Sequence, residues 1–159
     1  MENSGKNIQY SELICRSNFS FLKGGSSPEE LIERAKYLGY KSIAITDEVS
    51  VAGLVRAHKT AKKNNIKLIC GSQFWVKEKN LSLFYNLILL VKNKTGWKEL
   101  CKLITVARKK SEKNFYYLTT KTISSKNIEN CFALLLLPSS PLSLEKLQYI
   151  SDWFLSSIH

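Results

Sequence analysis

Short apolar runs alternate with amphipathic stretches along the chain from about Glu12 onward. The runs at 41–46, 66–70 and 132–137 have the length of buried strands and are bounded by polar or turn-forming residues. Between them, apolar residues recur at spacings of three and four, which predicts helices with one buried face. Strands followed by helices across short connections indicate an α/β domain, built on a parallel sheet or on a piece of a β/α barrel.

One further apolar stretch leaves two arrangements open. Residues 73–76 could continue the strand at 66–70, or they could pair with 83–91 as a hairpin across the polar turn at 77–82.

Four helices are expected. The first has the clearest start, because Ser27-Pro28-Glu29-Glu30 combines a serine cap, a first-turn proline and a glutamate three residues after the cap. Gly39 is placed to end this helix. The other three are expected over 50–64 with Ser50 as the cap, over 95–110, and from Ser143 onward. Their apolar stripes predict buried positions at Val55, Trp97 and Leu144, respectively.

Composition describes an ordinary globular chain with an unusual charge. The 159 residues allow one modest domain, and 44% hydrophobic with 23% charged residues can form a core. Lys and Arg number 24 against 13 Asp and Glu, a formal net charge of +11. This excess favours a polyanion such as nucleic acid as a partner. An AT-rich genome, which drifts towards lysine codons, would give the same excess.

Cysteine spacing and apolar segments bear on the cellular location. The four cysteines lie about thirty residues or more apart with no C-x-x-C pair, which predicts buried reduced thiols and no zinc module. Residues 1–10 are polar, predict a flexible N-terminus and hold no secretory signal. The apolar runs are too short to cross a bilayer, so we expect a cytoplasmic protein without membrane contact.

Asp47 and Glu48 are the first candidates for chemistry, because two carboxylates follow a predicted strand. Such a pair could hold a metal ion or act in acid–base catalysis. Alternatively, Asp47 or Ser50 caps the next helix while Glu48 favours its positive end. His58 and His159 are the two histidines of the chain, too few for a histidine-based metal centre.

A second candidate is the basic segment 92–113, which carries eight Lys or Arg against two acids and lies near aromatic residues. Basic and aromatic residues interleave in this way in proteins that bind single-stranded nucleic acid. A solvated helix face is the alternative, favoured by the expected burial of Trp97. The possible nucleic-acid contacts are Lys98, Lys102, Arg108, Lys109 and Lys110.

Taken together, these segments resemble the N-terminal polymerase-and-histidinol-phosphatase (PHP) domain of the bacterial DNA polymerase III alpha-subunit family. Within that family, the similarity is greatest to the error-prone branch used in damage-induced synthesis. The matching segments are collinear and cover nearly the whole chain: Tyr10–Leu31, Leu38–Tyr40, Ala44–His58, Leu68–Phe74 and Leu87–Thr105.

The resemblance implies a distorted seven-stranded β/α barrel that binds a metal cluster in members with a working site. In this chain most of the implied ligand positions hold other residues: Ile14, Arg16, Lys23, Glu48, Gln73 and Asn86. The resemblance therefore implies a degenerate site with no bound metal and no other cofactor. Our hypothesis is that Arg16 and Lys23 form ion pairs with Asp47 and Glu48, and that these pairs hold the loops as metals would.

Length sets the functional expectation. The family's polymerase domains, with their catalytic aspartates, lie beyond a PHP domain, so residues 11–159 are expected to be the N-terminal portion of that domain, with about five strands. We expect an N-terminal fragment of an error-prone DNA-directed DNA polymerase, acting in DNA repair and replication but inactive alone. DNA, through the parent polymerase, and other polymerase or repair subunits are the implied partners. The alternatives are a PHP-type metal-dependent phosphoesterase or 3′–5′ exonuclease, and a small basic nucleic-acid-binding module.

Overall fold

The computed structural model describes residues 10–78, 82–110, 116–138 and 141–157 of the chain. The predicted flexible N-terminus, except for Tyr10, therefore lies outside the described residues, as does the middle of the turn expected at 77–82. Six strands, one more than the approximate count expected, and five helices occur in the described part. They follow one another in the order β1, α1, β2, α2, β3, β4, α3, β5, α4, β6, α5.

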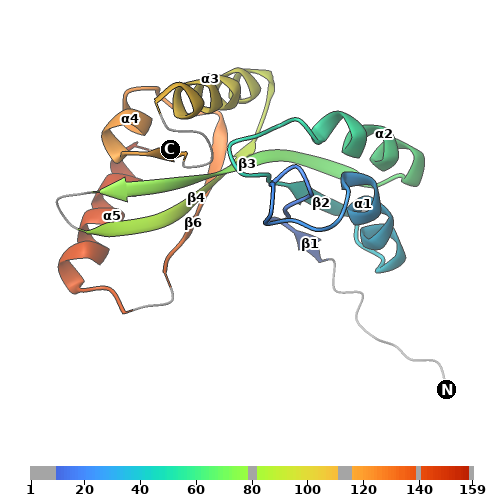
Figure 1. Cartoon of the computed structure of the whole chain (residues 1–159), viewed down its shortest axis with the longest axis horizontal. Helices are drawn as coiled ribbons and strands as arrows, with labels where there is room; N and C mark the ends of the chain where they lie inside the picture. The colour runs from blue at the N-terminus through green and yellow to red at the C-terminus, as the bar shows by residue number, and fades with distance from the viewer. Residues whose placement is uncertain (1–9, 79–81, 111–115, 139–140, 158–159) are drawn as a thin grey trace.

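The N-terminal half is a parallel arrangement of strands and helices, as the sequence pattern predicts. Strands β1 (Ser11–Glu12) and β2 (Ser42–Ile45) are parallel, and β2 is parallel to the first part of β3 (Lys67–Glu78). Helices α1 (Pro28–Tyr37) and α2 (Leu54–Asn64) connect these strands and pack against one face of them. The two helices lie side by side at this end of the molecule (Figure 1).

The C-terminal half is mainly antiparallel, so the expectation of a parallel sheet is wrong here. Strand β4 pairs antiparallel with the second part of β3, and β6 pairs antiparallel with β4. A connection of only a few residues between β3 and β4 permits a hairpin but not a parallel crossover. The elements of this half are β4 (Leu83–Val91), α3 (Lys94–Lys110), β5 (Tyr117–Leu118), α4 (Thr120–Ser124), β6 (Cys131–Leu136) and α5 (Leu144–Ser157).

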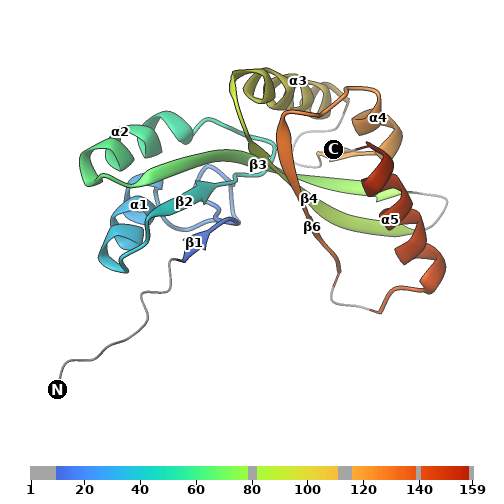
Figure 2. The ribbon, with the colours of Figure 1, turned by 180° about the vertical axis from the view of Figure 1, so that it is seen from behind.

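Strand β3 belongs to both halves and runs through the middle of the molecule (Figures 1 and 2). Cys70 is its last residue paired with β2, and Gly71 is its first residue paired with β4. A Cβ on Gly71 would lie 2.6 Å from the Leu89 carbonyl oxygen and 2.9 Å from Thr46 Cγ2. Glycine therefore permits the close approach at the point where β3 changes partner. Both arrangements left open for residues 73–76 are confirmed, because they continue one strand and also form a hairpin.

The sheet has the strand order β1-β2-β3-β4-β6, with the short β5 beside β3, and this α/β sheet fits a partial PHP-type barrel. One face is covered by helices, which form two hydrophobic clusters with it. The other face carries a small buried cluster of Ala44, Ile88 and Leu90, with no helical residue in it. Exposed apolar side chains, among them Phe84 and Phe132, follow the same strands.

Helix α1 has the predicted start and end. Ser27 Oγ accepts from the Glu30 N–H, Glu30 Oε2 accepts from the Ser27 N–H at 2.7 Å, and Gly39 follows with φ of +77°. The prediction for α2 is wrong at its start, because the helix begins at Leu54 with Gly53 as a cap that makes no side-chain hydrogen bond.

Three predicted burial positions are wrong. Val55 is exposed, Trp97 is 37% exposed, and Leu144 is 84% exposed. In α3 the buried stripe runs through Leu100, Leu103 and Ala107, so Trp97 falls at its margin. In α5 the burial is carried by Ile150 and Trp153 instead, and the Trp153 indole N–H donates to Ser124 Oγ at 2.9 Å. The described helices include none that is long and apolar enough to cross a membrane.

Candidate functional site

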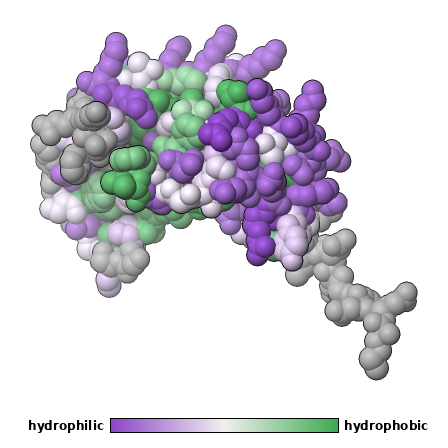
Figure 3. Space-filling model, turned by 45° about the vertical axis from the view of Figure 1, so that its right-hand side comes forward, coloured by the Kyte–Doolittle hydropathy of each residue, from purple (hydrophilic) through white to green (hydrophobic). Residues whose placement is uncertain are grey.

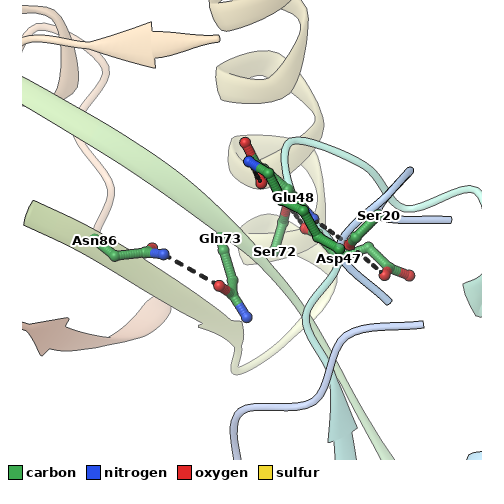
Figure 4. A network of polar contacts seen from close by, with 7 residues as sticks. Ser20, Asp47, Glu48, Ser72, Gln73 and Asn86 are labelled. Atoms are coloured by element: carbon green, nitrogen blue, oxygen red, sulfur yellow. Dashed lines mark hydrogen bonds and ion pairs between the residues drawn. The ribbon is translucent and has the colours of Figure 1, made fainter. Parts of the chain in front are cut away.

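The positions matched to metal ligands come together where the loops after β1 and β2 meet the middle of β3. The loop 46–50 returns to β3 through backbone hydrogen bonds, from the Gln73 N–H to the Asp47 carbonyl and from the Val49 N–H to the Gln73 carbonyl. Figure 4 shows Asp47, Glu48, Gln73 and Asn86 along this junction. The loop 16–27 closes over it.

Asp47 is buried, at 2% exposure, and its carboxylate is satisfied by serines of the loop 16–27. Oδ1 accepts from the Ser17 N–H at 2.8 Å and from the Ser20 hydroxyl at 2.7 Å, while Oδ2 accepts from the Ser17 hydroxyl at 2.7 Å. Three donors thus satisfy the hydrogen-bonding capacity of this buried carboxylate without any cation. The expectation that Asp47 or Ser50 caps α2 is therefore wrong, and Asp47 instead fastens one loop to the other.

Glu48 and Lys23 form an ion pair with 2.6 Å between Oε2 and Nζ. The Glu48 side chain is 12% exposed and the Lys23 side chain 43%, so the pair lies at the mouth of the junction. The Glu48 N–H also donates to Ser20 Oγ at 3.0 Å, and Lys23 Nζ lies 5.9 Å from the centre of the Trp75 ring. Two groups at implied ligand positions thus neutralise each other.

The side chains of Gln73 and Asn86 belong to a chain of hydrogen bonds that runs across neighbouring strands. Asn86 Nδ2 donates to Gln73 Oε1 at 3.1 Å (Figure 4). Gln73 Nε2 donates to Thr46 Oγ1 at 3.1 Å. Thr46 Oγ1 in turn donates to the Cys15 carbonyl at 3.2 Å. Amide side chains can both donate and accept, so these positions link β2, β3 and β4 directly.

The remaining two positions differ from each other. Ile14 packs against the cluster of Ala44, Ile88 and Leu90, so it contributes apolar contact to the sheet face without helices. Arg16 is half-buried and makes no ion pair among the residues that the structure describes. Of the four residues expected to form ion pairs, the structure joins Lys23 and Glu48, whereas Asp47 binds serines in place of Arg16.

These residues do not fit a metal cluster. Among the described residues, no three His, Cys, Asp or Glu side chains are placed to hold an ion. The sequence reasoning missed Ser17 and Ser20, the donors to Asp47. The available signal was two serines three residues apart in a loop that, like the one with Asp47, follows a strand.

The basic residues of α3 divide into two groups. Lys98, Lys102 and Lys109 are exposed, as predicted for a nucleic-acid contact, whereas the side chain of Lys110 lies outside the description. Arg108 turns towards the protein: its Nε donates to the Val49 carbonyl at 2.8 Å, and its guanidinium lies 5.1 Å from the Tyr116 ring centre. Arg108 also lines a cavity of about 430 Å³ beside the ion pair, together with Phe19, Phe21, Lys23 and Tyr116.

The fold and the site together define a PHP-type domain, and comparison of the sequence with protein families shows its membership of the PHP family directly. The PHP domain family matches residues 12–147, so the chain belongs to that family. Two solved structures share the fold: a protein from Bifidobacterium adolescentis assigned as a metal-dependent phosphoesterase, and an amidohydrolase from Chromobacterium violaceum. The first has a TM-score of 0.54 at 20% identity, covering 64% of this chain and 34% of that one; the second has 0.52 at 21%, covering 62% and 33%.

The similar curated proteins are error-prone DNA polymerases. The enzyme from Vibrio vulnificus strain YJ016 is 45% identical over 139 residues, which are 86% of this chain and 13% of that protein. The enzyme from Bordetella parapertussis is 40% identical over 152 residues, or 91% of this chain and 14% of that protein. The chain thus spans about one seventh of the length of these relatives, and the resemblance seen in its sequence is confirmed.

Proposed function

We propose that residues 11–159 are the N-terminal portion of the PHP domain of an error-prone DNA polymerase, acting in damage-induced synthesis, DNA repair and replication. In this proposal the portion is a scaffold that does not use bound metal. The ion pair between Lys23 and Glu48, at two implied ligand positions, is the observation that carries it. On the basis of the polymerase relatives, we also propose DNA as the substrate of the parent protein and the cytoplasm as its location. We extend the proposal to contacts with other polymerase or repair subunits.

The chemistry of the junction supports a scaffold because each group there already has an internal role. The Lys23 ammonium, at an implied ligand position, joins the loop 16–27 to the loop 46–50 through Glu48. Asp47 is held by serine donors, and Gln73 is held by Asn86 and Thr46. An incoming divalent cation would meet the positive charges of Lys23 and Arg16, which oppose its binding.

Metal analysis and enzyme assays of the whole chain test this proposal. We expect substoichiometric zinc and manganese after purification, and no hydrolysis of p-nitrophenyl phosphate or of single-stranded DNA from its 3′ end with added manganese. Stoichiometric metal that a chelator removes together with activity would overturn the scaffold proposal and establish the phosphoesterase or exonuclease alternative.

Removing the lysine tests the role of the ion pair in stability. Because Lys23 is 43% exposed, solvent screens the pair, and we expect Lys23→Gln to lower the free energy of unfolding by about 0.5–1 kcal/mol. Lys67→Gln, at an exposed lysine on β3 outside the described ion pairs and away from any helix end, is the control and should leave it unchanged. Urea denaturation measures both; equal values for the two variants would contradict a holding role for Lys23.

We propose nucleic-acid binding by α3 as a second function, on the strength of one observation. Four exposed lysines lie on one face of α3: Lys94, Lys98, Lys102 and Lys109. The last three follow Lys94 by four, eight and fifteen residues, which are close to whole numbers of helical turns. Trp97 is 37% exposed beside them, so an aromatic ring is available for stacking on a base. Binding should weaken steeply with salt, and should weaken further in Lys98→Gln/Lys102→Gln/Lys109→Gln. Undetectable or salt-independent binding would leave α3 as a solvated face.

A further inference from the structure

Helix α2 carries a second group of basic side chains that the sequence reasoning did not use. Its residues Leu54–Asn64 include Arg56, Lys59, Lys62 and Lys63 but no Asp or Glu. Arg56 is neutralised, because its Nε lies 2.6 Å from Glu29 Oε1. The three lysines are exposed and form no ion pair within the described part of the chain.

Helices α2 and α3 cover the same face of strand β3. Leu68 and Cys70 pack in the cluster that contains α2, whereas Phe74 and Val76 pack in the cluster that contains α3. All four positions are even-numbered, and alternate residues of a strand point to one face. Val51 packs against both clusters, so the two helices are neighbours along this face. Both lie along the same rim of the molecule in Figures 1 and 2.

The spacing suits a nucleic-acid backbone. The packing points of the two helices on β3, near residues 69 and 75, are six residues apart, or about 20 Å along a strand. One strand of B-DNA carries a phosphate about every 3.4 Å of axis, which gives about six phosphates over this span. Hydrophilic side chains project from this upper rim of the molecule in Figure 3.

Three acidic side chains near these helices, Glu29, Glu30 and Glu99, already have partners. Glu29 pairs with Arg56, and Glu30 caps α1. Glu99, the one acid of α3, accepts from the backbone N–H of Asn130 at 3.0 Å and from its side-chain amide at 2.8 Å. Lysines four apart, such as 59 and 63, therefore repel one another without a compensating carboxylate on the same face. A polyanion would relieve this repulsion and release counterions.

We propose that α2 and α3 form one surface that binds the phosphodiester backbone of nucleic acid, with Lys59, Lys62 and Lys63 contacting phosphates. This inference rests on the second proposed function, binding by α3, and adds α2 to it. The chemistry recognised is the backbone phosphate, which single-stranded and duplex DNA both present.

Fluorescence anisotropy tests the proposal with the whole chain, using a labelled 20-nucleotide single strand and a 20-base-pair duplex over 50–200 mM salt. For Lys59→Gln/Lys62→Gln/Lys63→Gln, we expect the slope of log affinity against log salt to become shallower by about 2 on the single strand or about 3 on the duplex. The probe that shows the loss identifies the form of DNA that reaches α2.

A matched control removes the same charge from another part of the surface. Lys36→Gln/Lys121→Gln/Lys126→Gln also takes away three exposed lysines, and we expect its slope to equal that of the parent chain. Lys62 and Lys63 lie in the last turn of α2, where cations stabilise a helix. Lys59→Gln alone avoids that effect and should make the slope shallower by about 0.7–0.9.

The outcomes separate the two proposals. A slope for the α2 variants equal to that of the control, with a shallower slope for the α3 variant, would overturn the role of α2 and leave binding by α3 standing. Slopes unchanged in both helices would overturn both.

Discussion

Gly24 and Gly25 are adjacent in the loop that closes over the site, but their surroundings differ. A Cβ on Gly24 would lie 2.0 Å from the Ser17 carbonyl oxygen, whereas a Cβ on Gly25 would meet nothing within 4 Å. Gly24→Ala must therefore displace the backbone beside Asp47. We expect it to lower the free energy of unfolding by about 1–3 kcal/mol, and Gly25→Ala to change it by less than about 0.5 kcal/mol. Urea denaturation measures both; equal effects would show that the loop adjusts freely.

The cysteines provide a second test at the scale of single residues. Burial, with smaller contributions from the carboxylates of Glu12 and Asp47, raises the pKa of Cys15 to about 11 from its ordinary value of 9.0. Burial, opposed by Lys92 and assisted by Glu99, also raises the pKa of Cys131 to about 11. Near pH 7.5 each native thiol then carries about 100-fold less reactive thiolate than in the unfolded chain.

We expect iodoacetamide to alkylate Cys15 and Cys131 at least about 100-fold more slowly in the native chain than in urea at the same pH. Peptide mapping over time measures each rate. The native rates should rise tenfold per pH unit from pH 7 to 10, because the thiolate fraction grows below a pKa of about 11. A native rate equal to the unfolded rate would show that these thiols are reached through open conformations.

The site shows which residue contacts a sequence can predict. The pairing of Lys23 with Glu48 follows from opposite charges at matched positions, and the structure contains it. The partners of Asp47 could not be predicted, because serine hydroxyls suit many acceptors and the choice depends on the path of the loop. That path is set by local backbone bonds, such as the one from the Asn18 N–H to the Ser26 carbonyl at 2.7 Å.

At the scale of elements, the start of α1 is stabilised by its capping box. Ser27→Ala removes the acceptor for the Glu30 N–H, and we expect it to lower the free energy of unfolding by about 1 kcal/mol. Ser26→Ala is the neighbouring control, since the described hydrogen bonds of Ser26 involve its backbone carbonyl. Thermal or urea unfolding compares them, and a control loss as large as that of Ser27→Ala would argue against the cap.

Local sequence signals predicted the helices and strands well. They did not predict which strands distant in sequence pair with one another. α1 has its cap, proline and terminal glycine in sequence, so its bounds could be predicted. The cap of α2 was placed three residues early, at Ser50 instead of Gly53, because the Ser50 hydroxyl accepts from the Ala52 N–H and forms a tight turn before the helix. The short connection after β3 fixes the direction of β4, whereas the direction of β6 depends on a partner distant in sequence, which apolar runs alone do not specify.

At the scale of the whole molecule, the sheet face without helices is where we expect association between chains. Phe132 is 61% exposed and Phe84 is 47% exposed, and both lie on strands whose small buried cluster faces the same side. Within the described residues, β6 pairs on one side only, with β4. Exposed apolar surface beside an unpaired strand favours association between chains.

We expect the isolated chain to associate as its concentration rises, and Phe132→Gln to reduce that association. Leu144→Gln is the control, because Leu144 is 84% exposed and belongs to helix α5, not to a strand. Light scattering during heating, with sedimentation at several concentrations, measures the effect. A monomeric parent with a sharp, reversible thermal transition would contradict the expectation, as would equal effects of the two variants.

Strand β3 has a consequence for how the molecule unfolds. Its first four residues pair with β2, and the eight that follow pair with β4, so one continuous backbone supplies strand partners to both halves. If either half opens, its part of β3 loses its partner strand, although the same strand is still paired in the other half. The two halves should therefore lose structure in a single cooperative step, and the backbone amides around Cys70 and Gly71 should exchange hydrogen with solvent more slowly than those of β1 or β5.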